Sequence, residues 1–161
     1  MNYLSAPLRI YIYALHGIAA EVLYTCLWEL VFNWNLKLPG NSHFWAFLIY
    51  GLFIFAIEKC QGYLRDTVGL PLALRCLVYA IFALAWEFSC GILLRQINAC
   101  AWDYAPWFHY NVMGLITFEY LPLWYFSSMV AEKILIHYTL RLCFSDKEQS
   151  YPQAISRKKK K

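Results

Sequence analysis

Long apolar runs are the feature that most constrains the fold of this chain. Four of them follow one another, near residues 10–32, 44–58, 72–94 and 112–133. About 20 apolar residues in a helix cross the roughly 30 Å hydrocarbon core of a bilayer. The second run is short, and polar residues at its ends can reach the interfaces by snorkelling. We therefore expect an all-α membrane protein, a bundle of four transmembrane helices formed by residues 1–144.

The composition excludes most classes of soluble protein. Hydrophobic residues make up 61% of the 161 residues and charged residues 15%, whereas soluble domains are about half apolar and a quarter charged. The net charge is +4, and five basic residues stand together at 157–161, so the rest of the chain is close to neutral. It lacks the basic surface of a nucleic-acid binder. The expected partners are membrane lipid and another membrane protein or a second copy of this chain, and no nucleic acid.

Basic residues near the helix ends predict the orientation, because they are retained in the cytosol. The connection between the second and third runs holds three of them, and more follow the fourth run, whereas the connections on the opposite side hold two. These are Lys59, Arg65 and Arg75 against Lys37 and Arg95. Both termini are therefore expected in the cytosol, and the connection that follows the third run on the lumenal or outer side.

The two ends of the chain leave alternatives open. Arg9 precedes the first run as it would in a cleaved signal peptide, but the run continues far beyond a cleavage site at Ala19–Ala20, which favours a membrane span. Residues 145–161 are expected to form a disordered basic tail in the cytosol. Its terminal lysines fit a dilysine retrieval signal of the endoplasmic reticulum or a polybasic patch for anionic lipids.

Short internal matches indicate that the chain repeats itself. Trp28–Leu30 matches Trp86–Phe88, and Glu58–Lys59 matches Glu132–Lys133. Two repeated helical hairpins of the same orientation would explain this, related by an axis along the membrane normal. Past Lys133 the pattern becomes amphipathic, which predicts an interfacial C-terminal extension of the fourth helix. Pro122 is expected to bend that helix from within.

Acidic residues inside the apolar runs carry most of the functional information. An ionised carboxylate at the centre of a membrane helix costs about 2.5–3.5 kcal/mol, so these side chains should turn into the bundle. They are Glu21, Glu29, Glu87 and Glu119. Two interpretations remain open. The glutamates either fix the helix register by pairing with Arg95, His16 or tyrosine hydroxyls, or line a chamber that binds or passes a small polar molecule, ion or lipid headgroup.

The third run and the loop after it supply further candidates. Spacings of four and seven residues place Glu87, Gly91 and Asn98 on one helix face, with Arg95 beside them. A small residue such as Gly91 lets a neighbouring helix approach closely. Asp103 is expected at the lumenal mouth of the chamber. The predicted ligand-binding residues are Glu21, Glu29, Glu87, Arg95, Asn98, Trp102, Asp103, Asn111 and Glu119.

Familiar catalytic arrangements are absent from the sequence, so no catalytic residue is assigned and no cofactor is expected. The six cysteines lack CxxC spacing, and the four histidines fall at different membrane depths, so no metal site is expected. The leading hypothesis is a permease-like or ligand-binding bundle. A lipid-modifying enzyme with a carboxylate as general base, and a non-catalytic assembly partner, remain as alternatives.

Several short segments together resemble a known family. They are YALHG (13–17), WEL (28–30), LPG (38–40), IYG (49–51), WEF (86–88), LRQINACAWDY (94–104) and MGLITFEY (113–120). In these the chain is similar to the transmembrane protein 229 family, in particular its B subgroup, and distantly to the bacterial type IV ABC-transporter permease family. Ala101 stands where the family would have proline, and the lysine-rich tail is a second departure. The resemblance implies a four-span membrane protein and supplies no reaction.

Overall fold

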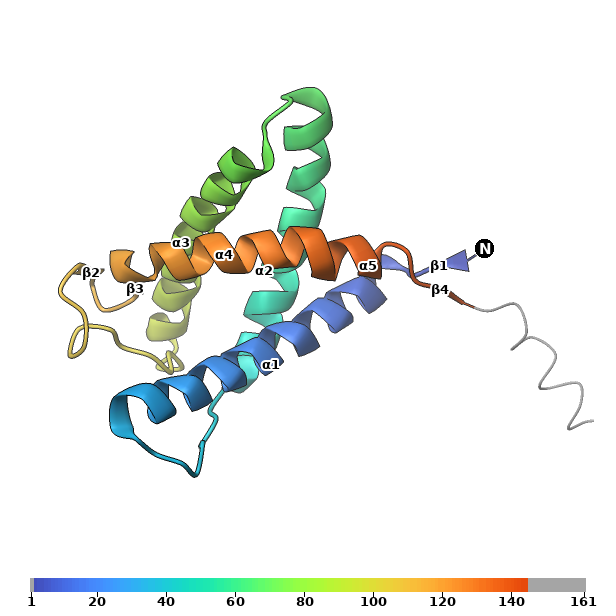
Figure 1. Ribbon diagram of the computed structural model, residues 1–161. Coiled ribbons are helices and arrows are strands. Elements are labelled where there is room, and N and C mark those ends of the chain that lie inside the picture. Colours follow the sequence, from blue (N-terminus) through green and yellow to red (C-terminus); the bar gives the residue numbers. More distant parts are fainter. Residues whose placement is uncertain (1, 145–161) are drawn as a thin grey trace, which may run out of the picture.

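The computed structural model describes residues 2–144, which form a mostly helical structure (Figure 1). Within them, three helices are long and apolar enough to cross a membrane: α1 (Ala6–Asn33), α2 (Phe44–Gly62) with its π-helical end η1 (Tyr63–Thr67), and α3 (Leu72–Gln96). Only 17% of the most apolar stretch of α1 is buried, so its large apolar side chains face outward. Such an exposed apolar surface suits acyl chains rather than water. The chain therefore has the character of a multi-pass membrane protein.

A fourth helical segment runs without a break through η2 (Phe118–Tyr120), α4 (Leu121–Val130), η3 (Ala131–Ile136) and α5 (His137–Thr139). The predicted extension past Lys133 is thus helical as far as Thr139. Residues 145–161, and with them the predicted basic tail and its terminal lysines, lie outside the described residues.

The start of this fourth helix differs from the prediction. Instead of a helix from Val112, β2 (Asn111–Val112) pairs antiparallel with β3 (Ile116–Thr117) around Gly114, whose φ of 67° suits glycine. Pro122 consequently lies in the first turn of α4 and not in its interior. A proline there removes an N–H that has no partner within α4 in any case, so the prediction that Pro122 lies in the helix interior is wrong.

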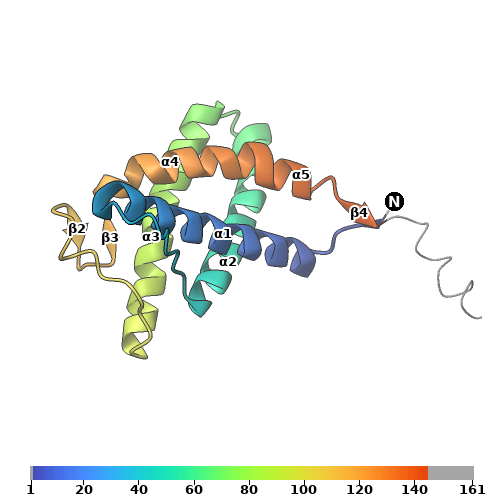
Figure 2. The ribbon, with the colours of Figure 1, turned by 60° about the horizontal axis from the view of Figure 1, so that its bottom comes forward.

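The helices contact one another in two consecutive pairs, α1 with α2 and α3 with α4, and we call these pairs the two hairpins. The helices of each pair cross at a large angle, and the pairs meet where α2 contacts α3 and η3 (Figures 1 and 2). The core at this junction is built by large apolar side chains from both hairpins. Its fully buried members include Tyr13, Ile57, Tyr79 and Ile136.

Each hairpin is closed at its open end by the same set of three side chains. In the first, Arg9 Nε donates to Glu58 Oε2 at 2.9 Å and Tyr13 Oη donates to the same oxygen at 2.7 Å. Arg9 Nη1 also donates to the carbonyl oxygen of Leu4 at 2.6 Å. A buried carboxylate that is paired and hydrogen-bonded in this way holds the two helices together, and removal of one partner is costly.

The second hairpin repeats this arrangement. Arg75 forms a two-pronged ion pair with Glu132, and Tyr79 Oη donates to Glu132 Oε2 at 3.0 Å. Arg75 Nη1 donates to the carbonyl oxygen of Leu70 at 2.6 Å, as Arg9 does to Leu4. We call the two sets, Arg9–Tyr13–Glu58 and Arg75–Tyr79–Glu132, the closing triads.

The closing triads agree with one of the two predicted sequence matches, because Glu58 and Glu132 are their acidic members. The same spacing along the chain separates Arg9 from Arg75, Tyr13 from Tyr79, and Glu21 from Glu87. The predicted match of Trp28–Leu30 with Trp86–Phe88 does not have this spacing. Glu21 and Glu87 therefore follow Arg9 and Arg75 at the same distance along the chain.

The two described ends of the chain lie side by side. Strand β1 (Asn2–Tyr3) pairs antiparallel with β4 (Cys143–Phe144). Figures 1 and 2 both place this pair at the far end of the molecule from β2 and β3. The start of α1 and the end of the fourth helical segment are thus at the same end of the structure.

Candidate functional site

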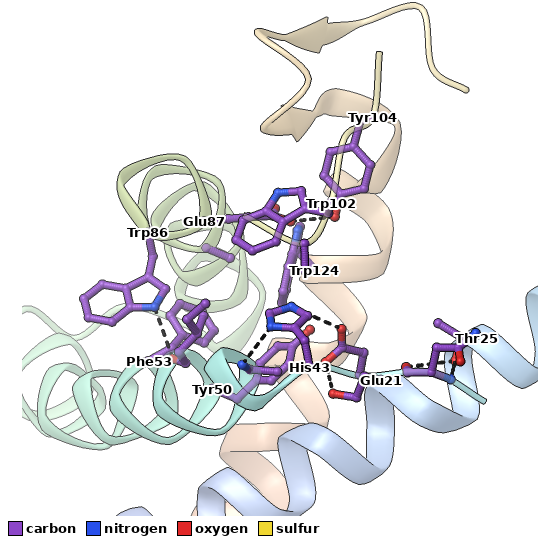
Figure 3. A pocket seen from close by; sticks show the side chains of 16 residues that line it. Glu21, Thr25, His43, Tyr50, Phe53, Trp86, Glu87, Trp102, Tyr104 and Trp124 are labelled. Carbon is purple, nitrogen blue, oxygen red and sulfur yellow. Dashed lines mark hydrogen bonds and ion pairs between the residues drawn. The ribbon is translucent and has the colours of Figure 1, made fainter. Parts of the chain in front are cut away.

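A partly open cavity of about 290 Å³ lies between the two hairpins (Figure 3). Its volume is close to the lower limit of small-molecule sites, about 300 Å³. Side chains from α1, α2, α3, α4 and both long connections line it. They include Glu21, Thr25, Ser42, His43, Tyr50, Phe53, Trp86, Glu87, Trp102, Tyr104 and Trp124. The cavity thus combines two carboxylates with a largely aromatic wall.

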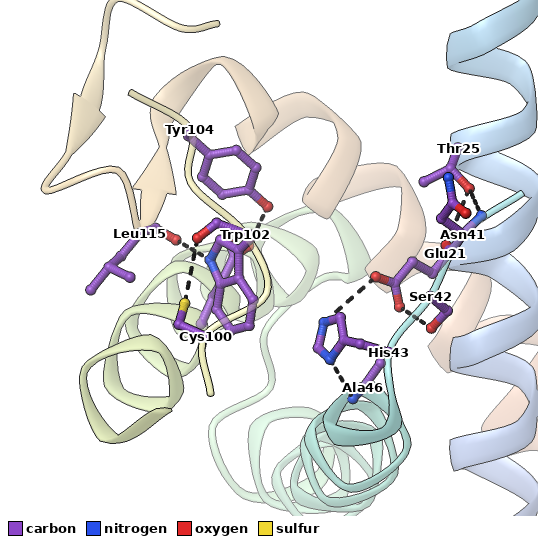
Figure 4. Close-up of polar contacts among 11 residues, drawn as sticks. Glu21, Thr25, Asn41, Ser42, His43, Ala46, Cys100, Trp102, Tyr104 and Leu115 are labelled. Carbon is purple, nitrogen blue, oxygen red and sulfur yellow. Dashed lines mark hydrogen bonds and ion pairs between the residues drawn. The ribbon is translucent and has the colours of Figure 1, made fainter. Parts of the chain in front are cut away.

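Glu21 is held by the connection between α1 and α2 (Figure 4). Ser42 Oγ donates to Glu21 Oε2 at 2.9 Å, and His43 Nε2 lies 3.9 Å from Glu21 Oε1. Thr25, one turn further along α1, accepts from the backbone amide of Asn41 at 2.9 Å. These contacts fold the connection back over α1 and direct the Glu21 carboxylate toward the cavity.

His43 is positioned as the N-cap of α2. Its Nδ1 accepts from the backbone amide of Ala46 at 3.2 Å, which satisfies one of the free N–H groups at the helix start. Because Nδ1 accepts, the proton of a neutral ring is on Nε2, the nitrogen nearer to Glu21. The ring also stacks on Trp102, with centroids 5.6 Å apart. His43 is therefore a polar donor of the cavity wall with a fixed orientation.

Glu87 is the second carboxylate of the cavity. Tyr104 Oη donates to Glu87 Oε1 at 2.6 Å. Within residues 2–144, Glu87 Oε2 and Trp124 Nε1 are both buried and have no hydrogen-bond partner. The indole N–H of Trp124 approaches Glu87 without reaching hydrogen-bonding geometry. A buried carboxylate oxygen without a donor is unfavourable, and this one is enclosed by protein atoms and does not face the open part of the cavity.

Backbone carbonyls fix two of the tryptophans in the cavity wall. Trp86 Nε1 donates to the carbonyl oxygen of Ile49 at 3.2 Å, and Trp102 Nε1 donates to that of Leu115 at 3.0 Å. Gly91 gives room for this second contact, since a Cβ there would lie 2.7 Å from Leu115 and 3.3 Å from Trp102. The sequence predicts that a neighbouring helix approaches Gly91. In the structure, Leu115 and Trp102 of the connection between α3 and α4 approach it instead.

Tyr104 connects the cavity to an aromatic cluster outside it. Its ring packs edge-on against Tyr120, with centroids 5.3 Å apart, and Tyr24 Oη donates to Tyr120 Oη at 2.8 Å. Burial raises the pKa of Tyr104 above its usual value of about 10, and the neighbouring charge of Glu87 raises the pKa further. The hydroxyl therefore stays protonated and remains a donor to Glu87 at physiological pH.

Three of the nine predicted ligand-binding residues line the cavity: Glu21, Glu87 and Trp102. Glu29 does not. Its two carboxylate oxygens accept from the amide side chains of Asn33 at 2.9 Å and Asn35 at 3.1 Å. It thus organises the exposed C-terminal end of α1.

Arg95, Asn98 and Asp103 do not line the cavity. Arg95 Nη2 is 3.9 Å from Asp103 Oδ1, which also accepts from the backbone amide of Ala105 at 3.0 Å. Asn98 is exposed and has a φ of 54°, beyond the last residue of α3. The predicted face shared by Glu87 and Asn98 is therefore wrong, because the helix ends at Gln96.

Asn111 and Glu119 stabilise the loop that precedes α4. Asn111 donates to the carbonyl oxygen of Phe108 at 2.7 Å and accepts from the amide of Gly114 at 3.0 Å. Glu119 is exposed and accepts from the backbone amides of His109 and Tyr110, both at 3.0 Å. The Thr117 hydroxyl donates to the other carboxylate oxygen of Glu119. The prediction that Glu119 points into the bundle is wrong.

Several cavity residues were not among the predicted ones. His43 precedes an apolar run, and that N-cap position could have indicated it. Trp86 is next to Glu87 in the chain. Tyr50 and Trp124 carry no local signal, because only the contact between the hairpins brings them together. His16, a predicted partner of the glutamates, is exposed and its Nδ1 contacts the carbonyl of Ile12 in its own helix.

Comparison with known proteins gives no further assignment. No protein-family model matches the chain, and no solved structure matches its fold. The class of protein that the fold supports is a mostly helical, multi-pass membrane protein. The resemblance to the transmembrane protein 229 family stays a prediction.

Proposed function

We propose that this protein is a four-span membrane protein that binds a small polar molecule in the cavity between its two hairpins, as the membrane subunit of a permease would. One observation carries the proposal: two glutamates from different helices, Glu21 and Glu87, line the same partly open cavity. Carboxylates at membrane depth are costly, and they most often mark a ligand or ion pathway.

The fourth crossing in this proposal is the helical segment Phe118–Thr139. At 1.5 Å per residue it is about 30 Å long, which matches the hydrocarbon core of a bilayer. The pairing of β1 with β4 supports an even number of crossings, because it keeps both ends of the described chain on one side. With the basic residues Lys59, Arg65 and Arg75 on that side, the side is assigned to the cytosol.

The two hairpins are proposed to be internal repeats of the same orientation. The closing triads support this, since they use the same three residue types, the same backbone carbonyl contact and the same spacing between the arginine and the tyrosine. In parallel repeats of this kind a binding site at the repeat interface lies near the middle of the membrane. Glu21 and Glu87 face the cavity from equivalent positions, one from each repeat.

The cavity is proposed to open to the lumenal or outer side. Residues 41–43, 101–102 and 104 line it, and they belong to the connections at the end of the molecule remote from β1 and β4 (Figure 1). The Asp103 and Arg95 pair lies beside this opening. A retrieval signal in the terminal lysines would direct this orientation to the endoplasmic reticulum.

The proposal is tested with the purified full chain in dodecyl maltoside. Thermal unfolding and tryptophan fluorescence are measured against a panel of small amines, carboxylic acids, sugars, amino acids and phosphates. At least one class should raise the midpoint of unfolding of the wild type and of Glu29→Gln, whose carboxylate lies outside the cavity. The same class should fail to stabilise Glu87→Gln.

Two results would overturn the proposal. One is that no compound of the panel changes either signal in a saturable way. The other is that a stabilising compound acts equally on the wild type, Glu29→Gln and Glu87→Gln, because binding would then not involve the cavity.

A further inference from the structure

We propose that the ligand of this cavity is a small substituted ammonium ion, bound between Glu21 and Glu87 and against the aromatic wall. The inference rests on the proposed function and names the chemical class of its ligand. Charge and the composition of the cavity wall both support it.

The charge of the cavity is not balanced by the protein. Among the residues that the structure describes, no Lys or Arg lines the cavity, and His43 is the nearest nitrogen base, 3.9 Å from Glu21. Arg9 and Arg75 are committed to the closing triads. The wall therefore offers two carboxylates and no cation, which disfavours an anion and favours a ligand that brings a positive charge.

The aromatic wall favours an organic cation over an inorganic one. Indole and phenol rings attract a cation within about 6 Å of the ring centre, and tryptophan is the strongest of them. Trp86 and Trp102 are held in place by bonds to backbone carbonyls, so their rings are preorganised. A divalent metal ion would instead require about six oxygen ligands, and most of this wall is apolar.

The contacts available to such an ion are defined by the structure. The carboxylates of Glu21 and Glu87 line the cavity, where they can pair with the charge of a primary, secondary or quaternary ammonium ion (Figure 3). The cavity volume of about 290 Å³ accommodates an ammonium group with several carbon substituents. The ion can come from a free amine or from the headgroup of a choline or ethanolamine lipid, since both present the same charged end.

The experiment compares choline, ethanolamine and tetramethylammonium with 3,3-dimethyl-1-butanol, the uncharged analogue of choline in which carbon replaces nitrogen. Tryptophan fluorescence of the full chain is titrated in dodecyl maltoside at constant ionic strength. At least one cation should give a saturable change. The neutral analogue should bind about tenfold more weakly or worse, the factor expected for losing a charge-assisted contact.

The variants Glu21→Gln and Glu87→Gln should each weaken cation binding by about tenfold or more, and Glu29→Gln should leave it unchanged. Should either cavity variant fail to fold, the comparison of cation with neutral analogue in the wild type still decides the inference. Equal affinity for choline and the neutral analogue would overturn it.

The outcomes separate this inference from the proposed function. If no cation binds but another class of the panel stabilises the protein in a manner dependent on Glu87, the ammonium ligand is wrong and the binding site stands. If nothing binds, both fall. Reconstitution into nanodiscs of phosphatidylcholine or phosphatidylglycerol identifies the source of the ammonium ion. A fluorescence change that occurs with phosphatidylcholine alone and is reversed by free choline assigns the ion to the lipid headgroup. A response only to added choline assigns it to a free amine.

Discussion

The close approach of α1 to α2 at Gly17 gives the sharpest test of the packing. A Cβ at Gly17 would lie 2.3 Å from Cβ of Tyr50 and 2.6 Å from its Cγ. The Cβ of Tyr50 is fixed to the backbone of α2, so no change of rotamer relieves the overlap. The two helices would have to separate by about 1 Å to restore an ordinary carbon–carbon contact of about 3.5 Å.

Gly17→Ala should therefore destabilise the protein by about 1–3 kcal/mol, the usual cost of overpacking a close interface. Gly62→Ala is the matched control. No atom lies within 4 Å of a Cβ placed there, and the φ of −60° is helical, so the substitution should stabilise by about 0.4–1 kcal/mol.

Both variants are measured by reversible unfolding in mixed micelles of dodecyl maltoside and sodium dodecyl sulfate, followed by far-ultraviolet circular dichroism. Because Tyr50 also lines the cavity, Gly17→Ala should weaken ligand binding as well. The reasoning would be refuted if Gly17→Ala were as stable as the wild type, or if Gly62→Ala lost as much stability as Gly17→Ala.

The remaining predictions concern charges and protonation. Arg75→Met should cost about 3–5 kcal/mol in the same unfolding assay, because it leaves the buried Glu132 unpaired. Arg65→Gln, the control, breaks an exposed pair and should cost less than about 1 kcal/mol. Equal losses of stability in the two variants would contradict the role of the closing triads. Tyr104 should not ionise at pH 10–11, since its pKa is raised. The wild type and Tyr104→Phe should therefore show the same phenolate absorbance at that pH. A larger absorbance in the wild type would contradict the burial of Tyr104. A tyrosine with a raised pKa in the folded state stabilises that state below about pH 10, and the contribution is lost as the pH rises above this value.

The helices follow from the sequence because hydropathy and length act locally. The runs predicted at 10–32, 44–58 and 72–94 correspond to α1, α2 and α3, with ends that differ by a few residues. The fourth run was less accurate, since the residues from Val112 to Thr117 are as apolar as a helix but form a hairpin around Gly114. A positive φ at glycine is compatible with the sequence without being required by it.

The sequence predicts the direction of the glutamate side chains correctly in the middle of the helices, where the only other environment is lipid. The prediction is less accurate at the helix ends. Glu21 and Glu87 stand in the middle of their helices and turn into the cavity as expected. Glu29 and Glu119 stand near ends, where backbone amides and amide side chains satisfy them outside the bundle. The sequence does not reveal this difference, because it depends on where each helix stops.

By itself, the sequence determined that this chain forms long apolar helices suited to a membrane and that buried acidic side chains inside them need partners. Both results follow from the free energy of transferring side chains and charges out of water. Only the tertiary structure decided which partners they have. The repeated spacing of Arg9–Tyr13 and Arg75–Tyr79 is visible in the sequence, but Glu58 and Glu132 join them through contacts between helices that are distant along the chain. The cavity has the same origin, since side-chain packing between the hairpins, and no local preference, brings Tyr50 and Trp124 to the two carboxylates.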